Sequence, residues 1–160
     1  RAQRAVYDLL SPKMYPVCLR YAGDRDSAMD ILQDGFITLF GKIDSFRGDG
    51  SFEGWARRIF VTTALMNLRK RDIFRNAEEL DSASGEVNFS PEIFDKLSAA
   101  DLMKIIKSMP DGFRTVFNLY VIEGYSHQEI GEMLKISDSS SRSQLSRART
   151  WLQNKLKAEG

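Results

Sequence analysis

The sequence has almost none of the residues that most often bind metals or form cross-links. Cys18 is the only cysteine and His127 is the only histidine among 160 residues. A single cysteine cannot form an intrachain disulfide, and one cysteine with one histidine cannot supply the ligands of a structural zinc site. We therefore expect no disulfide, no metal and no cofactor, which makes redox and metal-dependent enzymes poor candidates.

Long apolar runs are also missing. A helix needs about 20 consecutive apolar residues to cross a bilayer, and the longest runs here contain only a few. The first residues lack the apolar segment of a secretory signal peptide. We therefore expect a folded protein of the cytoplasm with no membrane insertion. Because the sequence begins at Arg1 rather than at a methionine, we also expect that its N-terminus has been trimmed.

The net charge of +1 hides an uneven distribution. Residues 1–75 contain 13 basic and 9 acidic side chains, residues 76–100 contain 1 and 6, and residues 101–160 contain 9 and 7. Two basic blocks around an acidic one indicate two anion-binding units joined by a segment that repels or imitates nucleic acid. A solvated acidic linker explains the middle block equally well.

Helical periodicity dominates both basic blocks, and no comparable alternating strand pattern is present. In the first block, apolar residues recur at intervals of three and four, with an interruption by a Gly-rich loop at residues 48–51. In the second block, an apolar stripe from Leu102 stops at Pro110, whose ring cannot continue a helix. The prediction is an all-α protein with two small helical domains, residues 1–75 and 98–160, joined by an acidic, flexible linker at residues 76–97.

The second block ends in a predicted helix-turn-helix. Gly124 ends one helix, and Ser126 with Glu129 forms the capping-box pattern that begins a short helix reaching about Leu134. After a short turn, a long helix starts at Asp138. In this motif the second helix lies in the major groove and presents the side chains near its N-terminus to base edges. The candidate DNA-reading residues are Ser139, Ser140, Arg142, Ser143, Gln144, Arg147 and Arg149. A surface helix rich in small polar residues is the alternative.

Two segments of the first block carry binding chemistry of other kinds. The helix around Asp34 has an acidic edge and an apolar edge, which suits docking on a basic partner helix, although an amphipathic core helix has the same pattern. Farther along, arginines accompany Phe52, Trp55 and Phe60. Cations beside aromatic faces are typical of single-stranded nucleic acid binding, whereas core aromatics next to a solvated helix end are the alternative.

Five stretches in this order resemble the extracytoplasmic-function group of bacterial sigma factors over nearly the whole chain. They are DILQDGF (30–36), FRGDGSFEGWARRI (46–59), LRKR (68–71), EGYSHQEIG (123–131) and SQLSRAR (143–149). The resemblance implies a transcription initiation factor without catalytic chemistry that directs core RNA polymerase to promoters. It also implies contacts with the clamp and flap of the polymerase, with promoter DNA and with an anti-sigma factor.

The resemblance assigns roles to particular residues. The first stretch would hold the polymerase clamp through Asp30, Ile31, Gln33, Asp34, Phe36 and Phe40. The second and third stretches would melt and read the minus-10 element through Phe52, Trp55, Arg58, Thr62, Arg69, Lys70 and Arg71. The last two stretches belong to the helix-turn-helix, whose candidate residues would bind the minus-35 element.

The chain departs from the family pattern at several positions. Met29 stands where an acidic residue is frequent, and Thr62 and Met66 replace an asparagine and an aspartate of the promoter-reading helix. Three further departures lie in and after the turn, at Lys135, Ser139 and Ser141. We still expect the turn to form, because Ser137 or Asp138 can cap the helix that follows.

Two alternative functions follow from the same residues. A helix-turn-helix repressor or activator that acts without polymerase would normally dimerise on a palindrome, but it leaves the acidic helix and the loop at residues 47–52 unexplained. An enzyme needs a nucleophile, a base or a metal cluster. Four aspartates could be imagined as a metal site, but their spacing is irregular: Asp24, Asp26, Asp30 and Asp34. We therefore expect no catalytic residues.

Overall fold

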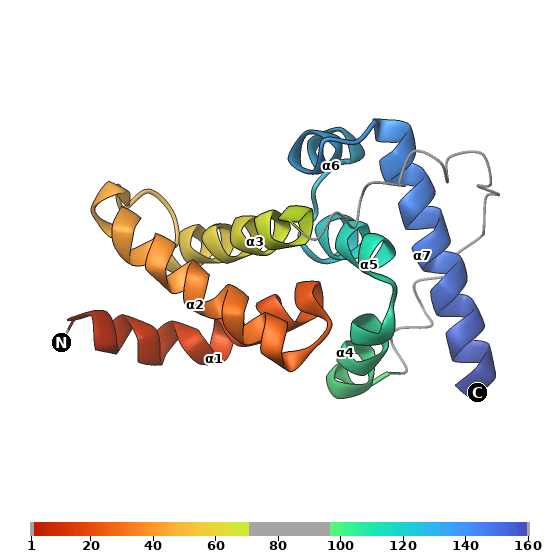
Figure 1. Cartoon of the computed structure of the whole chain (residues 1–160), viewed down its shortest axis with the longest axis horizontal. Coiled ribbons are helices and arrows are strands. Elements are labelled where there is room, and N and C mark those ends of the chain that lie inside the picture. The colour runs from red at the N-terminus through yellow and green to blue at the C-terminus, as the bar shows by residue number, and fades with distance from the viewer. Residues whose placement is uncertain (1, 71–96, 160) are drawn as a thin grey trace. The chain divides into compact units, whose positions relative to one another are not determined.

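The computed structural model describes residues 2–70 and 97–159, and these residues are helical without any strand. The chain divides into two compact units, Arg1–Arg71 and Asp72–Gly160, which are called unit 1 and unit 2 (Figure 1). This confirms the all-α class with two helical parts. Residues 76–96 of the predicted linker lie outside the described residues, so its flexibility stays a prediction.

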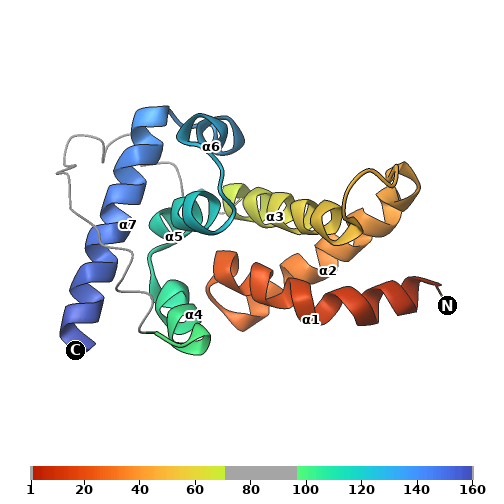
Figure 2. The same cartoon turned by 180° about the vertical axis from the view of Figure 1, so that it is seen from behind.

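Unit 1 is a bundle of three long helices. It contains α1 (Ala2–Ala22), α2 (Arg25–Lys42), the short 3-10 helix η1 (Ile43–Ser45) and α3 (Phe52–Lys70). Each of the three long helices contacts the other two, and Figure 2 shows the bundle from behind. The side chain of Asp24 begins α2 by accepting a hydrogen bond from the backbone N–H of Ser27 at 2.8 Å. The predicted loop between α2 and α3 is confirmed.

The core of unit 1 is apolar and closely packed. Its largest fully buried side chains are Leu10, Met14, Tyr21, Ile31, Leu39, Phe60 and Leu68. Cys18 is 0% exposed, and burial raises the pKa of its thiol to about 12. The thiol therefore stays protonated at neutral pH and acts as a small apolar core group rather than as a nucleophile.

The described residues of unit 2 form four α-helices and one π-helical turn. They are α4 (Ala99–Ser108), α5 (Asp111–Phe117), the π-helical turn η4 (Asn118–Ile122), α6 (His127–Leu134) and α7 (Asp138–Glu159). The long helix α7 contacts both α5 and α6. The predicted stop at Pro110 is confirmed, because α4 ends at Ser108 and α5 starts directly after the proline. The π-helical turn was not predicted, since its wider winding leaves no distinct apolar spacing over one turn.

Helices α6 and α7 form the helix-turn-helix. Both hydrogen bonds of the predicted capping box are present between Ser126 and Glu129, each 3.1 Å long. Lys135 ends α6 in the left-handed region with φ of 59°, although the family pattern favours glycine there. The Ser137 hydroxyl accepts a hydrogen bond from the backbone N–H of Ser140 at 3.0 Å. The expected cap is therefore made by Ser137, and the turn forms without the usual glycines.

None of the described helices combines the length and the apolar character that crossing a bilayer requires.

Candidate nucleic-acid and protein interfaces

Fewer of the candidate DNA-reading residues of α7 are exposed than the sequence predicted. Ser139 and Arg142 are exposed. Three other candidate DNA-reading side chains are buried: Ser140, Ser143 and Gln144 are 0%, 4% and 3% exposed. The Gln144 Oε1 atom lies 3.3 Å from the position that a Cβ on Gly112 would take, so Gln144 packs against the start of α5. These three side chains lie in the interior of unit 2, and their assignment to DNA stays a prediction.

The α7 residues on the accessible side follow a helical spacing. Ser139, Arg142, Ser146 and Arg149 recur at intervals of three and four residues, which places them along one side of a helix. Arg147 and Arg149 are half-buried, and each makes contacts within the protein. The charges of Arg142 and Arg149 both act on His127 at the start of α6. The two guanidinium groups therefore lie near the first helix of the helix-turn-helix.

His127 belongs to the same surface, although sequence reasoning did not single it out as a site residue. Its ring stacks on Tyr120 with a centroid distance of 4.4 Å and an interplanar angle of 17°. Its Nδ1 atom lies 2.8 Å from the Ser141 hydroxyl. Burial lowers the pKa of His127, and the charges of Arg142 and Arg149 lower it further while Asp138 acts in the opposite direction. The neutral ring is therefore the dominant form at neutral pH.

An aromatic cluster in unit 1 joins the start of α3 to the segment before the loop. The ring centroids of Phe46, Phe52 and Trp55 lie 5.3 to 5.6 Å apart. All three rings are half-buried. The three rings pack on one another and keep an accessible side, whereas Phe60 is 0% exposed and belongs to the core. Stacking of Phe52 and Trp55 on a base stays a prediction.

A hollow of about 270 Å³ lies between α2 and α3, beside this aromatic cluster. Its lining comprises Thr38, Lys42, Trp55, Arg58, Ile59, Thr62, Thr63 and Met66. The structure thus brings together three of the predicted minus-10 residues, Trp55, Arg58 and Thr62. It adds two residues of α2, Thr38 and Lys42, that the sequence did not single out. This region is called the α2–α3 hollow.

The remaining minus-10 candidates do not line the α2–α3 hollow. Phe52 belongs to the aromatic cluster, and Arg69 is exposed near the end of α3. The side chain of Lys70 and the whole of Arg71 lie outside the described residues. Their assignment to promoter DNA therefore stays a prediction.

The predicted polymerase-binding residues of α2 divide into surface and core. Asp30, Gln33 and Asp34 are exposed, and Phe40 is half-buried. Ile31 is 0% exposed and Phe36 is 4% exposed, so these two mainly hold α2 against the bundle. The Phe36 ring packs on Tyr7, Phe40 and Phe60 with centroid distances of 4.7, 5.8 and 5.0 Å. Phe36 therefore holds α2 in place by packing beneath it and contributes little to the exposed surface of this helix.

A second hollow of unit 1, of about 460 Å³, lies over α2. Its lining comprises Tyr7, Met29, Asp30, Leu32, Gln33, Phe36, Ile37 and Phe40. Ile37 is 67% exposed and Met29 is 45% exposed. The acidic edge predicted for this helix is therefore bordered by accessible apolar side chains, a combination that suits a protein partner. Ile37 and Met29 were not among the predicted contacts, although their exposure makes them stronger candidates than Ile31.

Each of the two units matches a known protein family. The family description Sigma-70 region 2 matches residues 6–73, and Sigma-70, region 4 matches residues 99–152. The ECF RNA polymerase sigma factor SigW of Bacillus subtilis is 31% identical over 95% of this chain and 87% of its own length. The chain belongs to the extracytoplasmic-function group of sigma factors. It is therefore a transcription initiation factor of the kind that directs RNA polymerase to promoters.

Other relatives of this sigma factor give a consistent result. The ECF sigma factor SigE of Mycolicibacterium smegmatis is 32% identical over 90% of this chain, which spans 57% of that relative's length. A solved complex of the sigma factor RpoE with the anti-sigma factor NepR from Bartonella quintana has a TM-score of 0.56, 21% identity and 98% coverage of both chains. That likeness concerns the fold.

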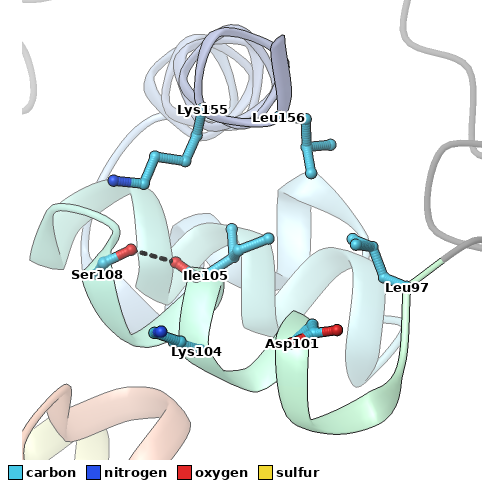
Figure 3. A pocket seen from close by; sticks show the side chains of 7 residues that line it. All are labelled: Leu97, Asp101, Lys104, Ile105, Ser108, Lys155 and Leu156. Carbon is cyan, nitrogen blue, oxygen red and sulfur yellow. Dashed lines mark hydrogen bonds between the residues drawn. The ribbon is translucent and has the colours of Figure 1, made fainter. Parts of the chain in front are cut away.

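A third hollow lies within unit 2 of the sigma factor, between α4 and the end of α7. It has a volume of about 490 Å³, and Figure 3 shows Lys155 and Leu156 of α7 on one side and residues from Leu97 to Ser108 on the other. Ile105 and Leu156 supply apolar surface, and Lys104 and Lys155 supply positive charge. This α4–α7 hollow lies far along α7 from Arg142, so it is a separate surface of the same unit.

The aspartates around α2 do not gather into a metal site. Within the described parts of the chain, no group of three or more His, Cys, Asp or Glu side chains could hold a metal ion. Asp24 instead caps α2, and Asp30 borders the hollow over that helix. Asp24 thus has a local structural role, and Asp30 belongs to the surface.

Proposed function

We propose that the sigma factor divides promoter recognition between its two units. Unit 1, with the predicted bounds 1–75, binds core polymerase through α2 and holds unpaired minus-10 bases in the α2–α3 hollow. Unit 2, with the predicted bounds 98–160, binds the minus-35 duplex through α7. The observation that carries this proposal is that the hollow over α2 and the α2–α3 hollow have no residue in common, the first being acidic and apolar and the second cationic and aromatic.

The chemistry of the α2–α3 hollow fits an unpaired base. Extruding a base from a duplex costs a few kcal/mol. Stacking on an aromatic side chain recovers about 1 to 3 kcal/mol per base, and Trp55 offers a half-buried ring for it. Lys42 and Arg58 are both exposed at this hollow and can neutralise neighbouring phosphates.

The two DNA contacts reinforce each other because one chain carries both. Binding of one unit makes binding of the other intramolecular and so raises its effective concentration. The length of the predicted linker, residues 76–97, limits the distance between the two promoter elements at which both units can bind at once. The proposal therefore includes a strong dependence of transcription on the distance between the two promoter elements.

Residues of α7 carry the minus-35 contact in this proposal. Arg142 is the strongest candidate for reading a base, because it is exposed near the start of the helix that enters the major groove. Arg can donate two hydrogen bonds to guanine O6 and N7. Ser139, Arg147 and Arg149 then serve phosphates or neighbouring bases.

Arg142→Ala is expected to weaken binding of the minus-35 duplex by about 1 to 3 kcal/mol, because a bidentate contact to guanine is lost. The measurement is fluorescence anisotropy with a labelled duplex carrying the minus-35 element of a promoter found by transcription. Lys157→Ala is the matched control, since it removes an exposed cation from the far end of the same helix. Equal affinity of the Arg142 variant and the parent would remove Arg142 from the interface.

Protein partners occupy the other surfaces in this proposal. The polymerase clamp contacts the exposed side chains of α2, among them Asp30, Asp34 and Ile37. The α4–α7 hollow of unit 2 suits the polymerase flap, because it combines apolar surface with lysines. An anti-sigma factor would cover one or more of these surfaces, and the RpoE–NepR complex is an example of such a pairing in a protein of similar fold. The sigma factor has no catalytic role of its own and acts in the cytoplasm, where polymerase meets the chromosome.

Run-off transcription tests the function directly. Purified bacterial core polymerase is combined with the full chain and a fragmented genomic template library. We expect new start sites that share two upstream elements at a fixed distance. Palindromic duplex binding by the protein alone, with no new start sites from a cognate core polymerase, would favour the repressor alternative instead.

Asp34→Arg is expected to weaken binding to core polymerase by roughly tenfold or more, because it reverses a charge on the exposed edge of α2. Binding of the minus-35 duplex by unit 2 should not change. Asp44→Arg introduces the same charge change on an exposed side chain of η1 and serves as the control. Normal polymerase binding by the Asp34 variant would show that α2 is not the clamp contact.

A further inference from the structure

The side chains that line the α2–α3 hollow differ in the hydrogen bonds that they can form with each DNA base. Its exposed cations, Lys42 and Arg58, can only donate hydrogen bonds. Within residues 2–70 and 97–159 neither cation forms an ion pair, so both remain available to a ligand. The described lining contains no carboxylate and no side-chain amide. The hollow therefore offers strong donors to a base but few acceptors.

The hydroxyl groups of Thr38, Thr62 and Thr63 can accept hydrogen bonds from a base but carry no charge. The Thr63 hydroxyl already donates to the backbone carbonyl of Ile59 at 2.7 Å. Thr62 is exposed and keeps its hydroxyl available at the surface. An exocyclic amino group of cytosine or adenine that enters the hollow would lie beside two cations that repel it and would meet only neutral hydroxyl acceptors, so it gains less there than a carbonyl oxygen that accepts from a cation.

Apolar groups complete the lining on α3. Trp55 and Ile59 are half-buried, and Met66 is 55% exposed one turn beyond Thr62. A flexible thioether side chain adapts its shape to a small apolar group. The C5-methyl group of thymine is the apolar substituent that distinguishes this base from the others.

We propose that the α2–α3 hollow prefers thymine to the other unpaired pyrimidines and that Met66 is the specificity-determining residue. The carbonyl oxygens of thymine accept hydrogen bonds from Lys42 or Arg58, its ring stacks on Trp55, and its methyl group packs on Met66. The inference rests on the proposed function only in that the ligand is an unpaired base of promoter DNA. No covalent step is involved.

The chain contains two tryptophans, which allows a direct measurement at the hollow. Trp151→Phe in the full chain leaves Trp55 as the only tryptophan, so quenching of its fluorescence reports a base that stacks there. Short single-stranded oligonucleotides of thymidine, deoxyuridine and deoxycytidine are the probes. Thymidine is expected to bind roughly three- to fourfold more tightly than deoxyuridine, because the two differ by one methyl group worth about 0.8 kcal/mol. Deoxycytidine is expected to bind weakest.

A second substitution in this background assigns the preference to Met66. Met66→Ala should remove most of the difference between thymidine and deoxyuridine while it leaves stacking on Trp55 in place. Leu9→Ala is the matched control, because it truncates a 59% exposed apolar side chain of unit 1 that is not part of the α2–α3 hollow. The control should keep the full preference.

Three results would overturn the inference. They are equal affinity for thymidine and deoxyuridine, an unchanged preference in the Met66 variant, and no quenching of Trp55 by any of the oligonucleotides. None of these results decides whether the chain is a working sigma factor, because run-off transcription measures that separately. New start sites without a thymine preference would thus reject the role of Met66 and retain the proposed function.

Discussion

Arg114→Met is expected to destabilise unit 2 by about 3 kcal/mol, a large share of the 5 to 15 kcal/mol that stabilises a typical domain. Arg114 is 2% exposed. Its guanidinium donates to the Met109 carbonyl at 2.7 Å and to the Lys107 carbonyl at 3.4 Å, and it pairs with Asp111. These carbonyls lie in the last turn and at the C-cap of α4, where helix carbonyls lack partners within their own helix. The arginine therefore joins α4 to α5.

Methionine can fill part of the same volume but cannot donate a hydrogen bond. The variant leaves buried carbonyls unpaired, and each such group costs about 1 to 3 kcal/mol. Asp111 loses its cation as well, but its side chain is 34% exposed, so water replaces much of that interaction.

Urea unfolding monitored by tryptophan fluorescence measures this effect. Trp55→Phe leaves Trp151 of α7 as the only tryptophan, so the signal reports unit 2. Lys104→Met is the control, since it removes an exposed cation of α4 and should change the unfolding free energy by less than about 0.5 kcal/mol. An unfolding midpoint of the Arg114 variant equal to that of the parent would show that these hydrogen bonds add no net stability.

Gly35→Ala is expected to destabilise unit 1 by about 1 to 3 kcal/mol through overpacking. A Cβ at this position would lie 2.3 Å from two ring carbons of Phe60, which is itself 0% exposed and cannot move away. The higher helix propensity of alanine offsets up to about 1 kcal/mol of the cost. Asp34 and Phe36 flank Gly35, so the displaced helix should also weaken the polymerase contact that we propose for α2.

The same helix contains a matched control for this substitution. No atom lies within 4 Å of the position that a Cβ on Gly41 would take. Gly41→Ala should therefore leave stability unchanged or raise it by up to about 1 kcal/mol. The two variants are compared by thermal unfolding, with Trp55 as the reporter of unit 1 in the Trp151→Phe background. Equal midpoints for both variants would mean that α2 and α3 adapt to the extra methyl group.

Partial recovery of stability in the Gly35→Ala, Phe60→Leu double variant would identify the contact with the Phe60 ring as the cause. The close approach of α2 and α3 at this point also explains why a glycine occupies the middle of an exposed and charged stretch of helix. Gly35 was visible in the sequence as part of a resembling stretch, but its partner was not.

The candidate surfaces were predictable to different degrees. Arg142 could be chosen from the sequence because it follows the first turn of a helix whose start was marked by local capping residues. The burial of Gln144, two residues later, could not be predicted, because it depends on contact with α5. His127 could not be singled out for the same reason, since its stacking on Tyr120 and its hydrogen-bonding distance to Ser141 join separate helices.

The sequence by itself determined the helical class, the division into two helical parts, the capping box and the helix-turn-helix. These features depend on residues three or four positions apart, which lie together on any helix. Only the tertiary structure decided which side of each helix is accessible. Ile31 lies inside although it precedes an exposed acidic edge, and Thr38 of α2 and Trp55 of α3 line the same hollow. Burial and hollows depend on contacts between residues far apart in the chain, and helical spacing does not specify which helices will meet.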